Sequence, residues 1–456
     1  TFLGTEKTGK LMRKFSLPCI ISLLVGALYN IVDQLFIANA PYLGSYGNAA
    51  NTVVFPLTVI ALAIATMIGD GACSFISISL GAGENGKASR AVGNAITASL
   101  LSSLVLTAVY LIFSNAILTA FGATVNDETY ACAKEYFFYI SLGIPFYMFS
   151  QAVNPIIRAD GSPRYAMFTL LAGAICNCIL DPIFIFPCKM GMMGAAVATV
   201  AGQILSSVLS VIYLFRLKVL KLDKSAFVFD KSVLGRVLSL GGTSFLSQIS
   251  IVISMAAVLN MCRKYALTDP IFSNYSQIPT AVIGIVMKFF QIIISVSIGL
   301  SAGCIPIVGY NIGAKKNSRV LEILKKLIIT EAIIGFFATA IFELFPTALI
   351  NLFGAKNESI YYTQFAVKSI RILLSLTAVA CVNKGVFIFL QAAGKAALSN
   401  LLSVLREIVF GVALILVLPA FFGLDGILFF MPVADALTLI PVVITVIRLK
   451  REYGKE

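Results

Sequence analysis

The sequence predicts an all-α integral membrane protein with twelve transmembrane helices, arranged as two parallel-repeat six-helix bundles around a central cleft. Three observations lead to this prediction. Of the 456 residues, 59% are hydrophobic and only 12% are charged, whereas a soluble protein carries about 25% charged residues. The apolar segments are continuous runs of roughly 20 residues, the length of a membrane-crossing helix, and not the alternating strands of a barrel. The two halves of the chain also share repeated motifs.

Twelve apolar spans follow one another along the chain, and Pro and Gly interrupt several of them, as membrane helices tolerate. No signal-peptide pattern precedes the first span, so we expect the segment from Leu17 onward to serve as the first membrane anchor. The spans are expected near 14–38, 51–80, 92–118, 132–154, 163–186, 191–215, 237–261, 272–306, 320–344, 361–389, 398–420 and 424–447.

Short motifs of the first half return in the second half at one constant separation. Gly81-Ala82 returns as Gly313-Ala314, and the Phe-Gly-Ala at 121–123 returns at 353–355. Each half holds an even number of spans, so both halves enter the membrane in the same orientation and are related by an axis along the membrane normal. We therefore expect an N-lobe over residues 1–215, a cytoplasmic linker over 216–236 and a C-lobe over 237–456, with the substrate site between the lobes.

Lys and Arg gather in the segments on the N-terminal side of the membrane, which include Lys87, Arg90, Arg158, Arg164 and the basic stretch 216–236. The loops on the opposite side hold few of them. The positive-inside rule therefore predicts that both termini are cytoplasmic, in a multi-pass protein of the plasma (inner) membrane whose constant partner is the lipid bilayer. These topology signals explain the net charge of +13, and they form no aromatic-interleaved patch, so no nucleic-acid partner is expected.

The residue inventory excludes several kinds of chemistry. The chain has no His, so no imidazole can relay protons, and its nine Cys are scattered without a CxxC pair. We expect no cofactor, no catalytic residues and no metal site apart from a position for Na+. A membrane-embedded enzyme would need a clustered catalytic set such as Ser and His, so it is a remote alternative.

A single acid, Asp33, interrupts the first span, at a cost of roughly 2.5 kcal/mol or more. Asp181, in NCILDPIFIF of the fifth span, lies at a similar depth, ~7–8 Å from the outer surface. Tyr29 and Asn177 each precede one of these acids by one helical turn on the same face, and Thr199 lies in the sixth span. Two carboxylates close together in a low dielectric cannot both ionise cheaply, so this group would exchange a proton or hold Na+. The alternative for each residue is a structural polar contact between helices.

Together these motifs resemble the multidrug and toxic compound extrusion (MATE) family in its prokaryotic form. The resemblance rests on the paired six-span halves, LYNIVDQLFIA in the first span, NxxxD followed by Pro in the fifth, GAAxAT in the sixth, and the loop endings LGAGENGKASRA and YNIGAKKNSRV. It covers nearly the whole chain. It implies that the coupling H+ or Na+ is bound by Asp33, Asn177, Asp181 and Thr199, with Tyr29 and Tyr136 as partners. Asn154 also matches a polar position of the family, although the span estimate places it near the cytoplasmic end of its helix.

The second half departs from one branch of the family, which keeps a sodium site formed by acids in the seventh and tenth spans. Neither 237–261 nor 361–389 contains an acid here, so such a site is not expected. We instead expect a polar cluster in the C-lobe, formed by Lys288, Lys384, Arg406 and Glu407. It would be a structural group of ion pairs with snorkelling Lys, a site for anionic groups of the substrate, or a cluster that shifts polarity between conformations.

The resemblance implies a secondary active exporter that carries amphipathic, cationic organic compounds in exchange for H+ or Na+. Phe and Met on the walls of the cleft would supply apolar and cation–π contacts. No pore-forming oligomer is needed, so we expect a monomer. The alternative is a lipid or lipid-linked oligosaccharide flippase of the same superfamily, in which Lys288, Lys384 and Arg406 would grip pyrophosphate.

Overall fold

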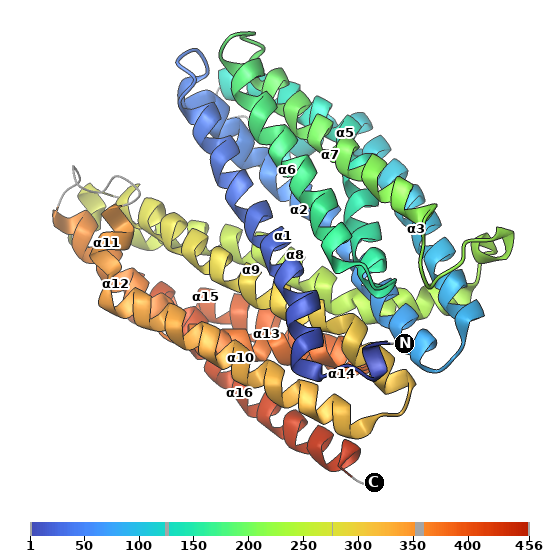
Figure 1. Cartoon of the computed structure of the whole chain (residues 1–456). Coiled ribbons are helices and arrows are strands. Elements are labelled where there is room, and N and C mark those ends of the chain that lie inside the picture. Colours follow the sequence, from blue (N-terminus) through green and yellow to red (C-terminus); the bar gives the residue numbers. More distant parts are fainter. Residues whose placement is uncertain (1, 124–126, 276, 352–359, 455–456) are drawn as a thin grey trace.

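The computed structural model describes residues 2–123, 127–275, 277–351 and 360–454, which form helices and turns without a strand among them (Figure 1). The helices of the first half are α1 (Thr8–Ala38), α2 (Gly44–Gly81), α3 (Asn85–Ile112), α4 (Ser114–Ala120), α5 (Asp127–Ala159), α6 (Pro163–Ile185) and α7 (Gly191–Leu214). Those of the second half are α8 (Lys231–Ala266), α9 (Gln277–Gly313), α10 (Asn317–Leu344), α11 (Pro346–Asn351), α12 (Ile360–Leu373), α13 (Thr377–Ala392), α14 (Ala396–Val404), α15 (Ala413–Phe422) and α16 (Leu424–Tyr453).

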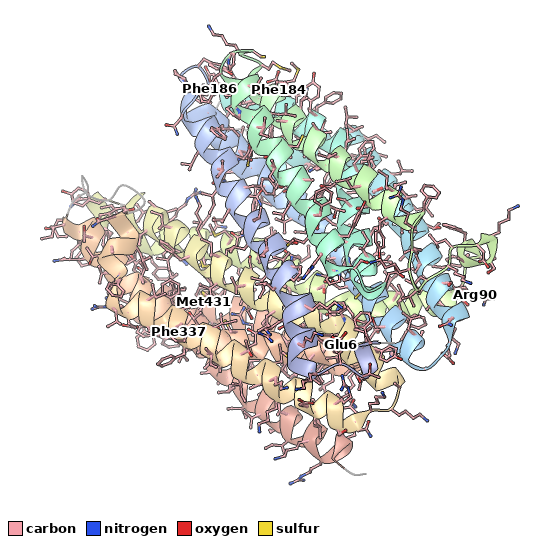
Figure 2. All side chains as sticks on the ribbon, in the orientation of Figure 1. Glu6, Arg90, Phe184, Phe186, Phe337 and Met431 are labelled. Atoms are coloured by element: carbon pink, nitrogen blue, oxygen red, sulfur yellow. The ribbon has the colours of Figure 1, made fainter. Side chains whose placement is uncertain are left out.

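Ten of these helices are long and apolar enough to cross a membrane, and so is the continuous helical segment Ala396–Phe422, which contains α14 and α15. The bent pair α12–α13 brings the number of candidate spans to twelve within the described ranges. Large apolar side chains cover their outer surfaces. Phe337 of α10, for example, is 63% exposed and lies on the outside of the bundle (Figure 2). Exposed apolar surface of this extent is suited to contact with lipid. The predicted all-α membrane fold is therefore confirmed.

Two spans are not the continuous α-helices that the sequence predicted. The tenth is bent by 43° between α12 and α13, where Ser375 lies in a turn. The eleventh changes from α-helix to π-helix over Leu405–Val412, between α14 and α15. Hydropathy does not reveal either break, because the side chains stay largely apolar while only the backbone hydrogen-bond pattern changes.

The two halves repeat the same order of helices. In each half a long helix, α2 or α9, is followed by a helix of 28 residues, α3 or α10, and then by a short one, α4 or α11. The turns after α2 and α9 follow the repeated Gly-Ala pairs and contain a residue of positive φ, Gly83 at 78° and Lys315 at 55°. Helices commonly end in such a residue. The repeated motif thus encodes one helix-ending turn that is used twice.

The two halves diverge as the arms of a V, with α1–α7 in one arm and α8–α16 in the other (Figure 1). They meet at the end of the molecule that carries both termini, here named the closed end, where α1 packs on α9 and α2 packs on α8 and α9. Glycine allows this approach: a Cβ on Gly71 of α2 would collide with the carbonyl of Val237 in α8, and one on Gly303 of α9 would collide with Ser16 of α1. One large buried apolar cluster includes residues of both halves, and two further clusters each lie within one arm.

The N-terminal residues reach across to the second half. Asn311 of α9 and Arg319 of α10 both donate hydrogen bonds to the carbonyl oxygen of Leu3. α8 begins at Lys231, so its first residues lie within the stretch 216–236, which stays a predicted linker. The N-terminal residues therefore add contacts between the two halves at the closed end.

Candidate ion-coupling site and central cavity

Asp33 of α1 and Asp181 of α6 lie against each other inside the first half. Their side chains are buried, and the two carboxyl groups are within hydrogen-bonding reach of one another. No donor among the described residues bonds to Oδ1 of Asp33 or to either carboxyl oxygen of Asp181. No Lys or Arg of the described ranges interacts with the pair. Two facing acids without a cation have the composition of a site that takes up H+ or Na+.

Four further polar side chains surround the acid pair. Asn177 donates from Nδ2 to Oγ1 of Thr199 in α7 at 3.1 Å, while its Oδ1 has no donor within the described residues. Tyr29 of α1 and Tyr136 of α5 lie close enough for their phenol groups to interact with both carboxylates, and Tyr136 also approaches Thr199. Oxygen atoms from four helices thus converge on one buried point.

The local sequence explains how α6 presents its two polar residues. Asn177 and Asp181 are four positions apart and therefore share a helix face. Pro182 follows and has no N–H, so it cannot donate the helical hydrogen bond to the preceding turn. Gly173 of α6 faces Gly202 of α7, and a Cβ on either would collide with the backbone of the other. This close approach brings Asn177 into contact with α7.

Asn154 does not belong to this group. Its Nδ2 donates to the carbonyl oxygen of Ala166 at 2.7 Å and to Oγ1 of Thr169 at 3.4 Å, so it joins α5 to the first turns of α6. It also lines the cavity described next. The other six residues named from the sequence for the first half, namely Tyr29, Asp33, Tyr136, Asn177, Asp181 and Thr199, lie together.

A cavity of about 250 Å³ lies between the two halves, beside the acid pair. Tyr29, Asn177 and Thr199 line it, whereas Asp33 and Asp181 do not. Residues of α8, α9 and α13, such as Gln248 and Gln291, form the wall of the second half. Ser, Thr, Asn, Gln, Leu and Ile dominate the lining. No Phe or Met of the described residues lines it, so the expectation of Phe and Met walls is wrong for this cavity.

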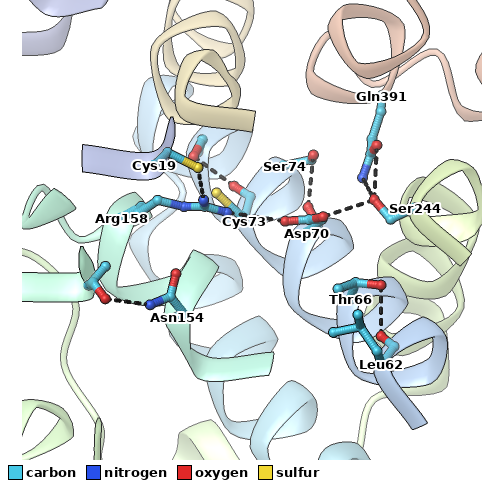
Figure 3. A network of polar contacts seen from close by, with 12 residues as sticks. Cys19, Leu62, Thr66, Asp70, Cys73, Ser74, Asn154, Arg158, Ser244 and Gln391 are labelled. Atoms are coloured by element: carbon cyan, nitrogen blue, oxygen red, sulfur yellow. Dashed lines mark hydrogen bonds and ion pairs between the residues drawn. The ribbon is translucent and has the colours of Figure 1, made fainter. Parts of the chain in front are cut away.

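A buried polar network forms the floor of the cavity, toward the closed end (Figure 3). Asp70 of α2 accepts hydrogen bonds from Arg158 of α5 at 3.2 Å and from Ser244 of α8 at 2.9 Å. Arg158 also donates to Sγ of Cys19 in α1, and Ser244 is hydrogen-bonded to Gln391 of α13. The network therefore connects three helices of the first half with two of the second.

Sequence reasoning missed this floor network. Arg158 was counted with the cytoplasmic topology signals, but its side chain is 7% exposed and paired with Asp70. Asp70 and Ser244 are 174 residues apart, so no local pattern relates them. The available signal was an acid in the second span and a basic residue at the end of the fourth. These opposite charges could pair, but the sequence does not show that the two side chains are in contact.

A second buried polar cluster lies within the second half. Lys384 of α13 donates to Glu407 at 2.6 Å, and Arg406 donates to Glu407 at 2.8 Å and to Asp435 of α16 at 2.9 Å. Lys384 also donates to Ser247 of α8. Two positive and two negative charges balance here, as in a structural group of ion pairs. Asp435, in the last span, completes the cluster, and the sequence prediction did not include it.

Lys288 does not join that cluster, contrary to the sequence-based expectation. Its Nζ donates to Oε1 of Gln34 in α1 at 3.3 Å. The reason is the packing of α9 against α1, which turns this face of α9 toward the first half and away from α13. Lys288 therefore contacts the helix that carries Asp33.

Comparison with known sequences finds one family. The model of the MatE family matches residues 18–183 and 253–417, one segment in each half of the chain. The multidrug export protein MepA of Staphylococcus aureus (strain MSSA476) is 25% identical over 444 residues, which cover 97% of this chain and 94% of MepA. MepA of Staphylococcus saprophyticus is 25% identical over 443 residues, which cover 96% and 93%.

Solved structures share the architecture. The MATE multidrug transporter DinF-BH, whose structure was solved as a complex, is 33% identical with a TM-score of 0.88, over 99% of this chain and 98% of that one. An outward-facing multidrug resistance MATE family transporter of the MOP superfamily is 21% identical with a TM-score of 0.88, over 100% and 98%. A MOP superfamily transporter from Pyrococcus furiosus, whose reverse polarity of the binding pocket suggests a different function, is 22% identical with a TM-score of 0.87, over 98% of both chains. The last two similarities concern the fold alone.

The family match extends over both repeats and most of the chain, and it coincides with the two-armed helical fold seen here. The chain therefore belongs to the MATE family of multidrug efflux transporters.

Proposed function

We propose that the chain exports amphipathic, cationic organic compounds in exchange for H+ or Na+, and that Asp33 and Asp181 bind the coupling ion. One observation carries the proposal. Two buried carboxyl groups with oxygens that lack donors among the described residues stand beside a cavity shared by both halves. Two negative charges in a membrane span are costly, and one H+ or Na+ would reduce that cost. The similarity to DinF-BH, a multidrug transporter, supports the assignment of an organic substrate to this chain.

The residues around the acid pair have distinct proposed roles. Asn177 offers an Oδ1 without a donor among the described residues as a further oxygen for the ion. Thr199 accepts the hydrogen bond that orients this amide. Tyr29 and Tyr136 would donate to the carboxylates when no ion is bound. Asn154 would act through the cavity lining and not through the ion.

The transport cycle follows from the position of the pair. The arms are apart at the end away from the termini, and ion uptake there neutralises the acids. The neutral pair then changes the packing of α1 at Tyr29 and Gly26, which line the cavity, and substrate leaves. A Cβ on Gly26 would meet no atom within 4 Å, so α1 has free space at this point. Return of the protein to the state open at the opposite end discharges the ion.

The same proposal sets the orientation and the limits of the lobes. We place both termini in the cytoplasm of a cell whose plasma membrane holds the chain, because the basic residues gather at the closed end. We assign residues 1–215 to the N-lobe, 216–236 to a linker and 237–456 to the C-lobe. One chain supplies both walls of the cavity, which supports action as a monomer.

Flipping of lipids or of lipid-linked oligosaccharides has weaker support. That activity needs free cations in the cleft to hold pyrophosphate. Lys384 and Arg406 are instead paired with Glu407 and Asp435. Of the three basic residues named for this role, Lys288 alone has no carboxylate partner within the described chain. A lipid-flipping assay on the reconstituted protein separates the two functions.

Efflux from liposomes tests the proposed function. The purified chain is reconstituted, a fluorescent organic cation such as ethidium is supplied, and a proton gradient or a sodium gradient is imposed separately. We expect one of the two gradients to drive transport by the wild type and neither to drive it in Asp33→Asn. The matched control is Glu343→Gln, which removes an acid from an exposed ion pair elsewhere.

Two outcomes of this efflux experiment would contradict the proposed function. Efflux by Asp33→Asn against a gradient at the wild-type rate excludes Asp33 as the coupling residue. A wild type that responds to neither gradient excludes ion coupling as a whole. Exchange of labelled for unlabelled substrate without any gradient should persist in Asp33→Asn, and it shows that this variant is folded and binds substrate.

A further inference from the structure

Five basic side chains surround a cavity of about 760 Å³ at the closed end, separate from the central cavity. Lys10, Arg13 and Lys14 come from the first turns of α1, Arg164 from the start of α6, and Lys218 from the segment after α7. We propose that this basic pocket binds the anionic headgroup of a membrane phospholipid. The inference goes beyond the transport function proposed above and does not depend on it.

The fold builds one side of the basic pocket through a buried acid. Asp160 accepts hydrogen bonds from the Tyr213 hydroxyl and from the backbone N–H groups of Lys218, Val219 and Leu220. These four bonds fix the segment after α7 beside the start of α6. Both carboxyl oxygens of Asp160 are occupied in this way, so Asp160 holds the backbone at Lys218 and forms no ion pair with its ammonium group.

Most cations of the basic pocket are free to bind an anion. Arg13, Arg164 and Lys218 have no ion-pair partner among the described residues. Lys10 is largely exposed and pairs with the half-buried Glu6, and Lys14 lies over an aromatic ring, so neither cation is enclosed by carboxylates. The N-terminus of the 23-residue α6 also lines the pocket, and the positive end of its helix dipole favours an anion, although Pro163 has no N–H and Tyr165 donates its N–H to the Ser162 carbonyl. The guanidinium groups of Arg13 and Arg164 match a phosphate diester, and the ammonium groups beside them add positive charge.

Exposed apolar side chains beside the pocket favour a lipid over a soluble anion. Leu17 lies one turn beyond Arg13 and is 58% exposed, and Phe168 lies one turn beyond Arg164 and is 52% exposed. Phe215, just before the segment that carries Lys218, is exposed as well. A ring of basic residues next to an apolar strip is the pattern found where headgroups meet acyl chains. A phospholipid would satisfy both parts at once.

The basic pocket lies between the two helices that carry the buried acid pair. α1 carries Asp33 and α6 carries Asp181, and the pocket lies at the far ends of these helices. A headgroup held by Arg13 and Arg164 together would link the two ends. We therefore expect the bound lipid to stabilise the folded chain against heat.

Lipid binding by the purified full-length chain tests the proposal. Bound lipids are counted by native mass spectrometry, and the unfolding temperature is measured with phosphatidylglycerol, with phosphatidylcholine and with soluble glycerol 3-phosphate. The pocket variant combines Arg13→Gln, Arg164→Gln and Lys218→Gln. The control variant combines Arg448→Gln, Lys450→Gln and Arg451→Gln, which removes three exposed charges from α16 at the same end.

We expect phosphatidylglycerol to bind the wild type and the control variant and to raise their unfolding temperatures. In the pocket variant its affinity should fall roughly fivefold for each charge removed. The proposal is overturned if the pocket variant keeps the wild-type affinity, or if the control variant loses as much, because attraction would then be nonspecific. Equal stabilisation by glycerol 3-phosphate would assign the pocket to a soluble anion and overturn the lipid assignment.

Discussion

Ser244 of α8 donates a hydrogen bond of 2.9 Å to Asp70 of α2, and this contact crosses between the two halves at the floor of the cavity. The other carboxyl oxygen of Asp70 accepts from Arg158 within the first half. One hydroxyl group thus ties a buried ion pair of the first half to the second. In the proposed alternating-access cycle the halves separate at this end, so the bond between Ser244 and Asp70 must break in every turnover.

Replacement of Ser244 by Ala should favour the opposite state of the transport cycle, in which the two halves have separated at the end that is closed in this structure. A hydrogen bond to a charged group contributes about 1.5–3 kcal/mol, so its loss shifts the ratio of the two states by roughly tenfold or more. Cys19 is buried and bonded to Arg158, and it reports the opening. Maleimide labelling of Cys19, as the sole cysteine, should therefore accelerate in Ser244→Ala. Unchanged labelling, or an equal change in the exposed control Ser239→Ala, contradicts this role.

Replacement of Gly71 by Ala should hinder closure of the two halves. The added Cβ would collide with the carbonyl of Val237, and overpacking of this kind costs about 1–3 kcal/mol. We expect faster labelling of Cys19 and slower transport. The matched control is Gly235→Ala in α8, where a Cβ meets nothing within 4 Å. Wild-type transport and labelling in Gly71→Ala would show that the helices can separate slightly at no cost.

Replacement of Thr199 by Ala should weaken binding of the coupling ion. It removes the acceptor that orients the Asn177 amide, and loss of one such hydrogen bond costs about 1 kcal/mol, or roughly a fivefold change in affinity. The ion concentration for half-maximal efflux should rise, while the maximal rate is retained. Thr66→Ala serves as the control, because Thr66 lines the same cavity but bonds within its own helix. The proposed role of Thr199 is wrong if both variants shift equally.

Replacement of Glu407 by Gln should destabilise the second half without changing ion coupling. It leaves Lys384 without its buried carboxylate, and breaking a buried pair costs about 3–5 kcal/mol. Denaturant unfolding measures the loss. The double variant Glu407→Gln with Lys384→Met should recover much of the stability, because it removes the unpaired charge. A changed ion dependence of efflux in either variant would instead assign this cluster a part in coupling.

Hydropathy and the repeat were sufficient for much of the architecture. A bilayer requires long apolar helices, so the twelve spans can be read directly from composition. The repeated Gly-Ala pairs correspond to matching turns that hold Gly83 and Lys315. Helical periodicity likewise placed Tyr29 with Asp33 and Asn177 with Asp181, because residues four apart must share a face.

Contacts between helices could not be read in the same way. The rotation of each helix about its axis depends on packing with neighbours that are distant in sequence. That rotation turns Lys288 toward Gln34 and away from Glu407, and it buries Arg158 beside Asp70. Local periodicity therefore specifies which residues share one face of a helix. The contact of Asp33 with Asp181 and the floor network arise instead from the packing of separate helices.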